Sequence, residues 1–161
     1  MIKLVRCDDR MIHGQCIVRV LGDFAIGCII GVDDFTASNP VLKNIYKMAI
    51  PPHIKGGIYT SAEALSEISE RSADGLNTLV LVKSPQTALG LYKKTDCLPK
   101  ALNIGPMSSR KNSRKATMYA YLTDEEIEAI DELSNMGIRV YFNQIIEQKT
   151  EEWSTVKSAM K

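Results

Sequence analysis

The sequence predicts an α/β fold: a single three-layer domain whose mostly parallel sheet of about seven strands has helices on both faces. Short apolar runs of strand length alternate along the chain with longer segments of helical periodicity. The run at residues 78–82 is apolar on both faces, as in a central parallel strand covered by helices. The 161 residues, 45% of them hydrophobic, suit one domain with a buried core, so we expect one domain over residues 1–161.

Each element is predicted from the spacing of its apolar side chains. The expected strands are residues 2–6, 28–32, 58–59, 78–82, 101–104, 118–122 and 138–142. The expected helices begin at or just after Gly14, Pro40, Thr60, Pro85, Thr123 and Thr150. The polar stretches over residues 33–38 and 108–115 are expected to be loops.

Capping residues support three of these helices. Asn39 precedes a proline and can accept hydrogen bonds from the first free amides of the following helix. Thr60 with Glu63, and Thr123 with Glu126, match the capping-box pattern. Because strands and helices alternate, the carboxyl ends of the strands should share one edge of the sheet. Ligands bind at that edge in such folds, so the loops there are the expected place for a site.

Charge and cysteine content exclude several classes of function. The chain has 20 basic and 19 acidic side chains, so no net field attracts it to nucleic acid. Four cysteines without a C-x-x-C pair and only two histidines leave no zinc-type spacing, and we expect no metal. Cysteines in apolar stretches fit a reducing compartment, and no apolar run reaches the roughly 18 residues of a membrane span. We therefore expect a soluble cytosolic protein.

The segment over residues 8–15, Asp-Asp-Arg-Met-Ile-His-Gly-Gln, is the expected reactive site. It lies between the first strand and the first helix, so His13 is expected beside a helix N-terminus, where free amides and the helix dipole favour a phosphate. A neutral imidazole is a competent nucleophile, and Arg10 can bind two phosphate oxygens. Asp9 could orient the ring or anchor Arg10. The simpler alternative is a histidine with one satisfied hydrogen bond, beside acids that cap the helix.

These eight residues resemble the active-site segment of the IIB subunits of the mannose/fructose/sorbose family of the bacterial phosphoenolpyruvate-dependent sugar phosphotransferase system. The resemblance covers nearly the whole chain. It includes Val32-Asp33-Asp34, Ala49-Ile50-Pro51-Pro52, Asn103-Ile104-Gly105-Pro106-Met107, and residues 123–127 and 137–138. Several separate matches in the same order support the resemblance more strongly than one motif alone.

The resemblance implies a function. In that family the IIB histidine accepts a phosphoryl group from IIA and gives it to a sugar that the membrane subunits IIC and IID present. His13 is then the phosphorylated residue, and Arg10 stabilises the group in transfer. The expected neighbours of the site are Asp9, Gly14, Gln15, Asp33, Asn103, Gly105, Met107 and Ser108. The expected protein needs no cofactor and is cytoplasmic at the periphery of the membrane complex, while the sugar and any homo-oligomer stay open.

One departure from the family pattern lies in the loop after residues 101–104. Pro106 stands where the family has a second glycine, which removes an amide donor and fixes φ. The following stretch is also more basic than is usual in the family. Its cations are Arg110, Lys111, Arg114 and Lys115. This stretch is either a solvated loop or a docking surface for an acidic partner or a sugar phosphate.

Two other functions stay open, and these departures motivate the first of them. The first is a regulatory or degenerate IIB-like binding module, whose phosphorylation state is sensed and whose phosphoryl group is not passed on. The second and weaker one is a flavodoxin-like nucleotide binder. The sequence lacks both the G-x-G-x-x-G fingerprint and the P-loop signature, which counts against nucleotide binding.

Overall fold

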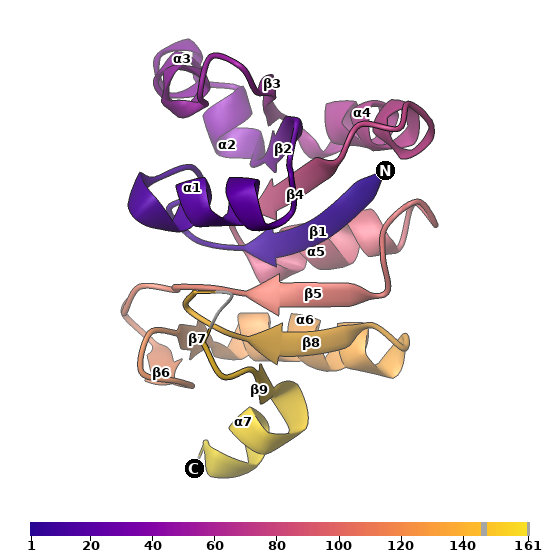
Figure 1. Cartoon of the computed structure of the whole chain (residues 1–161). Coiled ribbons are helices and arrows are strands. Elements are labelled where there is room, and N and C mark those ends of the chain that lie inside the picture. The colour runs from indigo at the N-terminus through magenta and orange to yellow at the C-terminus, as the bar shows by residue number, and fades with distance from the viewer. Residues whose placement is uncertain (146–147, 161) are drawn as a thin grey trace.

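A seven-stranded sheet forms the centre of the protein in the computed structural model, which describes residues 1–145 and 148–160 (Figure 1). Its strands are β1 (Ile2–Cys7), β2 (Cys28–Val32), β3 (Lys55–Tyr59), β4 (Thr78–Val82), β5 (Ala101–Ile104), β8 (Arg139–Phe142) and β9 (Glu151–Glu152). They lie in the order β3-β2-β4-β1-β5-β8-β9, and every neighbouring pair is parallel except β8 with β9. The predicted α/β class with a mostly parallel sheet is confirmed.

Helices cover both faces of the sheet. They are α1 (Gly14–Asp23), α2 (Asp34–Ala37), α3 (Pro40–Ala49), α4 (Ser61–Ala73), α5 (Pro85–Tyr92), α6 (Asp124–Asn135) and α7 (Trp153–Ala159). The buried side chains of α1 pack with one apolar cluster on one face, and those of α4, α5, α6 and α7 pack with another on the opposite face. In Figure 1, α1 lies in front of the sheet and α5 and α6 lie behind it. Among residues 1–145 and 148–160, no helix is long and apolar enough to cross a membrane.

The strand register places three loops at one edge of the sheet. Cys7, the last residue of β1, is paired with Val82 of β4 on one side and with Ile104 of β5 on the other. These three strands therefore end at the same level. The chain after β1 turns to the α1 face, while the chains after β4 and β5 lead to the helices of the opposite face. The β1–α1 loop thus emerges between two loops that diverge from it, a geometry that favours ligand sites in parallel sheets.

Local hydrogen bonds confirm the predicted helix caps. Asn39 accepts from the amides of the residues that begin α3, at 3.1 and 3.2 Å. The amide of Thr60 donates to Glu63 at 2.9 Å, and the amide of Glu63 donates to the Thr60 hydroxyl at 3.2 Å. The same reciprocal pair joins Thr123 to Glu126, at 2.9 and 3.3 Å. Side chains adjacent in the sequence are enough to form these contacts, which is why the sequence predicted them.

The predicted strand at residues 118–122 is wrong in its position and in its sheet. Only Tyr121–Thr123 form a strand, β7, which pairs antiparallel with β6 (Ser113–Lys115) in a separate hairpin. The Thr117 hydroxyl accepts from the amides of Tyr119 and Ala120, at 3.3 and 3.1 Å, and this turn replaces the first half of the expected strand. The seventh strand of the main sheet is β9 instead.

Two other expected boundaries change. The expected loop over residues 33–38 contains the short helix α2, because the Asp33 carboxylate accepts from the Thr36 amide at 3.0 Å and caps it. The expected loop over residues 108–115 contains β6, which follows a turn with Asn112 at φ 65°. The last helix begins at Trp153 and not at Thr150, since β9 precedes it.

Candidate functional site

The loop between β1 and α1 is held in a tight turn. The Asp8 amide donates to the carbonyl of Val82 at 3.0 Å, which continues the bonding between β1 and β4. The Met11 amide donates to the Asp8 carbonyl, and the Arg10 amide donates to the Asp8 carboxylate, both at 3.0 Å. Met11 has φ 54°, an uncommon value for a residue with a side chain, and its side chain is buried in the core under α1. The loop is therefore fixed at both ends.

His13 stands at the N-terminus of α1 with its ring partly exposed. It occupies the N-cap position in an extended conformation, and its side chain makes no capping hydrogen bond. The ring Nε2 lies 3.0 Å from Oδ2 of Asp8, where the His13 side chain is 21% exposed and that of Asp8 is 3% exposed. An ionised carboxylate only accepts hydrogen bonds, so in this contact Nε2 carries the proton. The lone pair at Nδ1 is left for another group.

The surroundings of the ring favour an anion. The first turn of α1 contains no acidic residue, so no carboxylate of the helix itself competes for its free amides and positive dipole end. Gly14, the first residue of α1, has φ +48°, a conformation that suits glycine. Arg10 is exposed in the same loop, and its side chain makes no hydrogen bond or ion pair with the residues that the structure describes. The side chain of Gln15 lies outside the described residues.

Asp9 joins the histidine loop to the loop after β5. Its amide donates to the carbonyl of Pro106 at 3.3 Å, and its carboxylate accepts from the Ser108 amide at 2.7 Å. Within the described part of the chain it contacts neither the His13 ring nor the Arg10 guanidinium. The contact with the ring that was expected for Asp9 is made by Asp8.

Three other expected neighbours face the interior of the protein. Asn103 is 1% exposed and hydrogen-bonds to Arg6 and to Asn143. The Gly105 amide donates to the Cys7 carbonyl at 2.8 Å. Met107 is fully buried and pairs through its backbone with residues of the segment before and within β7. These residues therefore lie in the interior, next to the end of β1 that leads into the histidine loop.

Asp33 lies after β2, at the same edge of the sheet as His13. Its carboxylate accepts from both the amide and the hydroxyl of Thr36, at 3.0 and 2.6 Å. The structure thus gives it a helix-capping contact, and within the described residues it makes no hydrogen bond with the His13 loop.

Two of the four cations in the basic stretch are paired. Arg110 donates to both carboxylate oxygens of Glu126, at 2.6 and 2.8 Å, and its Nε donates to the Ser108 carbonyl at 3.1 Å. Glu126 is 3% exposed, so this ion pair ties the hairpin to the core. Arg114 pairs with Asp124 at 3.1 Å on the surface. Arg110 is therefore a structural residue more than a docking residue.

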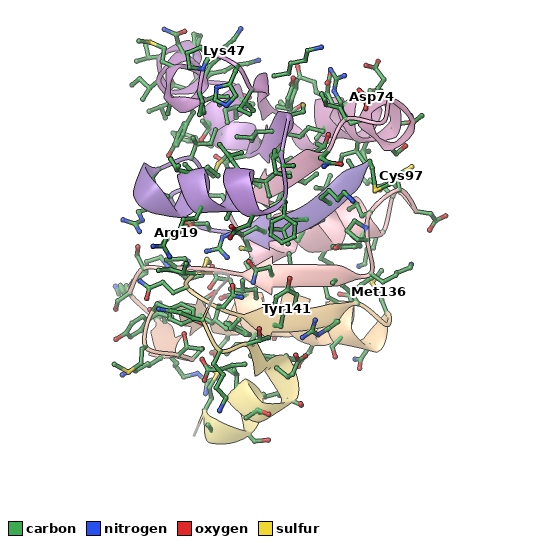
Figure 2. The ribbon with its side chains drawn as sticks, viewed as in Figure 1. Arg19, Lys47, Asp74, Cys97, Met136 and Tyr141 are labelled. Atoms are coloured by element: carbon green, nitrogen blue, oxygen red, sulfur yellow. The ribbon has the colours of Figure 1, made fainter. Side chains whose placement is uncertain are left out.

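Cysteines offer no competing nucleophile close to this loop among the described side chains. Cys7 ends β1 with no exposed surface, and burial raises the pKa of its thiol well above the ordinary value. Cys28 is buried in β2. Cys97 is exposed but lies at the opposite end of the sheet, before β5 (Figure 2). The side chain of Cys16 lies outside the described residues.

Asp8 is the residue that sequence reasoning missed. Two adjacent acids precede Arg10, and nothing in their spacing tells which one turns toward His13. The signal that distinguishes them is three-dimensional: the Asp8 side chain is buried beside the ring, whereas Asp9 reaches a loop almost 100 residues away.

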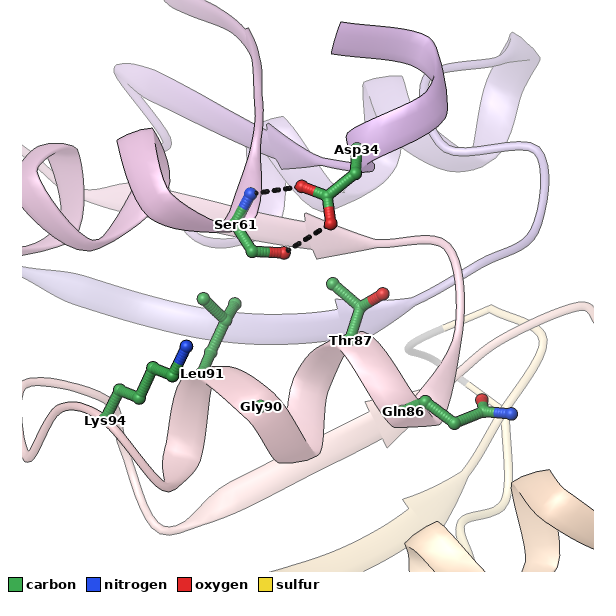
Figure 3. Close-up of a pocket in the computed structure, with 7 residues that line it drawn as sticks. All are labelled: Asp34, Ser61, Gln86, Thr87, Gly90, Leu91 and Lys94. Atoms are coloured by element: carbon green, nitrogen blue, oxygen red, sulfur yellow. Dashed lines mark hydrogen bonds between the residues drawn. The ribbon is translucent and has the colours of Figure 1, made fainter. Parts of the chain in front are cut away.

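A separate cavity of about 340 Å³ lies between α4 and α5 (Figure 3). Asp34 lines it and accepts from the amide and hydroxyl of Ser61, at 2.6 and 3.3 Å. Lys94 and Leu91 line it from α5 and the residues that follow. None of the residues expected at the phosphoryl site lines this cavity.

Comparison with known proteins identifies the family. The model described as "PTS system sorbose subfamily IIB component" matches residues 2–161. The chain is 25% identical over 152 residues to the "PTS system fructose-specific EIIB component" of Bacillus subtilis (strain 168), a match that covers 94% of this chain and 93% of that protein. It is 24% identical over 144 residues to the "PTS system mannose-specific EIIAB component" of Escherichia coli (strain K12), covering 89% of this chain and 44% of that protein.

The fold agrees with solved structures. The IIBSor domain of the sorbose permease from Klebsiella pneumoniae superposes on this chain with a TM-score of 0.90 and 22% identity, over 98% of this chain and 97% of that one. At this identity the likeness concerns the fold alone. Because the family model spans nearly every residue, the chain belongs to the sorbose subfamily of IIB components of the phosphotransferase system.

Proposed function

We propose that this protein accepts a phosphoryl group on His13 from a IIA phosphohistidine and passes it to a sugar during uptake through IIC and IID. The observation that carries the proposal is the contact between Asp8 and the His13 ring: Nε2 is bound at 3.0 Å, and the partly exposed ring keeps Nδ1 for reaction. Asp8 orients the ring and stabilises the charge that the ring gains on phosphorylation.

The first transfer follows from these roles. The Nδ1 lone pair of His13 attacks phosphorus, the bond from phosphorus to the donor's histidine nitrogen breaks, and that nitrogen keeps the electron pair. The Arg10 side chain has no described partner, and it binds two oxygens of the phosphoryl group during the transfer. The amides at the start of α1 face the same region and stabilise the bound group afterwards. No cofactor takes part in this step.

In the second transfer a sugar hydroxyl is the nucleophile and the His13 ring is the leaving group. The hydroxyl attacks phosphorus, the bond from phosphorus to Nδ1 breaks, and Nδ1 keeps the electron pair, so that His13 returns to its neutral form. The hydroxyl proton passes to solvent. The donor and acceptor must therefore occupy the same side of the ring in turn, so IIA and the membrane subunits bind one after the other. We place the protein in the cytoplasm, as one IIB domain at the periphery of the membrane complex.

Relatives of the chain support the partners. One relative is named as a mannose-specific EIIAB component, so a IIA unit and a IIB-like unit occur there in one protein. Relatives are named for fructose, mannose, sorbose and N-acetylgalactosamine, so the family does not fix the sugar. The sugar of this protein is the one that its own membrane subunits bind.

The regulatory alternative rests on Pro106 and the basic stretch. The Pro106 carbonyl accepts from the Asp9 amide, and Pro106 itself is buried. Arg110 and Arg114 pair with carboxylates of this chain. Neither feature indicates a degenerate site, so we favour transfer.

The test is reconstitution. The full chain is incubated with phosphoenolpyruvate, the general phosphotransferase proteins and a matching IIA, and the label is located by mass spectrometry. We expect one acid-labile phosphate at His13, which sugar and membranes holding IIC and IID then remove. His13→Ala should fold and stay unlabelled, whereas a label that persists in this variant, at Cys16 for example, would reject the proposal.

A further inference from the structure

A buried arginine lies under the proposed phosphoryl site. Arg6 is the penultimate residue of β1 and is 2% exposed. Its neighbours Val5 and Cys7 belong to the apolar cluster on the α6 face, so alternation along the strand directs Arg6 to the α1 face. A guanidinium is costly to bury, and such a residue persists only where several groups bind it.

Arg6 has hydrogen-bond partners at the ends of two other strands. Its Nη1 donates to the side-chain oxygen of Asn103 in β5 and, at 3.4 Å, to the carbonyl and side-chain oxygens of Asn143. Its Nη2 donates to the carbonyl of Gln144 at 2.8 Å. Asn103 in turn donates to the Asn143 side chain at 2.8 Å. The guanidinium thus joins the carboxyl ends of β1, β5 and β8.

The position of the Arg6 side chain requires glycine at residue 105. A Cβ atom at this position would lie 2.6 Å from Cζ of Arg6, much closer than real Cβ atoms approach other atoms. The Arg6 guanidinium is buried and held by hydrogen bonds to the ends of β5 and β8, so it cannot yield easily. Two residues at the end of β5 therefore accommodate Arg6. The Asn103 side chain binds the guanidinium, and Gly105, which has no side chain, leaves room for it.

The segment that Arg6 supports is the one on which the histidine loop rests. The Gly105 amide donates to the Cys7 carbonyl at 2.8 Å. The next contacts are those of Asp9, with the Pro106 carbonyl at 3.3 Å and with the Ser108 amide at 2.7 Å. Asp9 adjoins Asp8, which holds the His13 ring. A shift of residues 105–108 would therefore shift Asp8 and the ring with it.

We propose that Arg6 is a positioning residue for phosphoryl transfer, acting through Asn103 and Gly105 on the loop that carries Asp9 and, beyond it, His13. The proposal rests on His13 as the phosphoryl acceptor. In this proposal Asn103 and Gly105 hold Arg6 in position and do not contact the phosphoryl group directly.

Arg6→Lys tests positioning, since lysine keeps the charge and loses the planar fork of donors. We expect the kcat of phosphorylation by phosphorylated IIA to fall about 10- to 100-fold, because small displacements of reacting groups have effects of this size. The KM for IIA should stay within about twofold of the parent value, since Arg6 lies below the surface that IIA meets. Arg139→Lys, an exposed arginine of β8, is the matched control and should leave both constants unchanged.

A double-variant cycle tests the contact itself. Gly105→Ala should slow transfer in the parent, and in the Arg6→Met background it should cause little additional loss, because the clash is gone. The same cycle is read in the free energy of unfolding, which needs no phosphoryl transfer.

The outcomes separate the two proposals. A parent that IIA does not label rejects His13 as acceptor, and the unfolding cycle then still reports on the Arg6–Gly105 contact. A labelled parent with Arg6→Lys unchanged in kcat at equal folded fraction overturns the positioning role. Equal effects of Gly105→Ala in both backgrounds overturn it as well, even where Arg6→Met is too unstable for kinetics.

Discussion

The carboxylate of Asp8 lies 3.0 Å from Nε2 of His13, and this contact leaves Nδ1 as the ring nitrogen without a partner among the described residues. The carboxylate is almost fully buried and also accepts the Arg10 amide, so its position is set by the loop and not by the solvent. In the catalytic triads of many hydrolases, too, a buried carboxylate holds the imidazole in one tautomer and orientation.

Replacing Asp8 by asparagine should slow phosphorylation by about 100-fold or more, because an amide group can donate to Nε2 and shift the proton to Nδ1. The rate is measured by rapid mixing with phosphorylated IIA. Asp23→Asn, at the exposed far end of α1, is the matched control. A transfer rate in Asp8→Asn equal to that of the control would contradict the orienting role.

Replacing Arg10 by alanine should slow transfer without changing stability, since the side chain is exposed and binds no described residue in the resting protein. We expect a loss of about 10- to 100-fold in kcat, with only partial recovery in Arg10→Lys, which lacks the two-pronged guanidinium. Single-turnover kinetics and denaturant unfolding are measured side by side. An Arg10→Ala variant with the parent's rate would remove this residue from the mechanism.

Replacing Arg110 by alanine should lower the free energy of unfolding by about 1–3 kcal/mol, because the buried Glu126 carboxylate loses a two-pronged partner. Arg114→Ala breaks only an exposed pair, and its effect should stay within about 0.5 kcal/mol. Urea unfolding at neutral pH compares the two variants. Equal stabilities would show that the Arg110 pair is no stronger than a surface contact.

Alkaline pH should destabilise the protein through its tyrosines. Burial raises the pKa of Tyr119 to about 12, while an unfolded tyrosine loses its proton near pH 10. Between these values the unfolded state binds fewer protons, so the free energy of unfolding falls as pH rises.

Tyr119→Phe should make that fall less steep between about pH 10 and pH 12. It should not abolish the fall, because burial also raises the pKa values of Tyr92 and Tyr141. Urea unfolding over this pH range measures the slope. A slope equal to that of the parent would show that the Tyr119 hydroxyl ionises alike in both states.

Much of the fold could be predicted because its signals are local. The apolar run at 78–82 and the capping box at Thr60 depend on neighbours within a few residues, and both are confirmed. The strand expected at 118–122 was wrong, because an apolar run cannot reveal that the Thr117 hydroxyl binds two amides and turns the chain there. The partner of β8 was also hidden, since β9 has only two residues.

The candidate site, too, could be predicted from the sequence only in part. The octapeptide located the loop, and His13 and Arg10 lie where a strand, a loop and a helix place them. Asp8 could not be assigned, because its contact with His13 depends on which way its side chain turns. Arg6 could not be assigned, because its partner Asn103 lies almost a hundred residues away in the sequence. The prediction that His13 carries the phosphoryl group stays a prediction until it is measured.

The most direct measurement is the ³¹P–¹⁵N correlation spectrum of the full chain, labelled with ¹⁵N at histidine and phosphorylated through IIA. We expect one phosphorus signal coupled to Nδ1 of His13, which disappears when sugar and the membrane subunits are added. A phosphorus bound to Nε2, to a cysteine sulfur or to no residue of this chain would contradict the assignment.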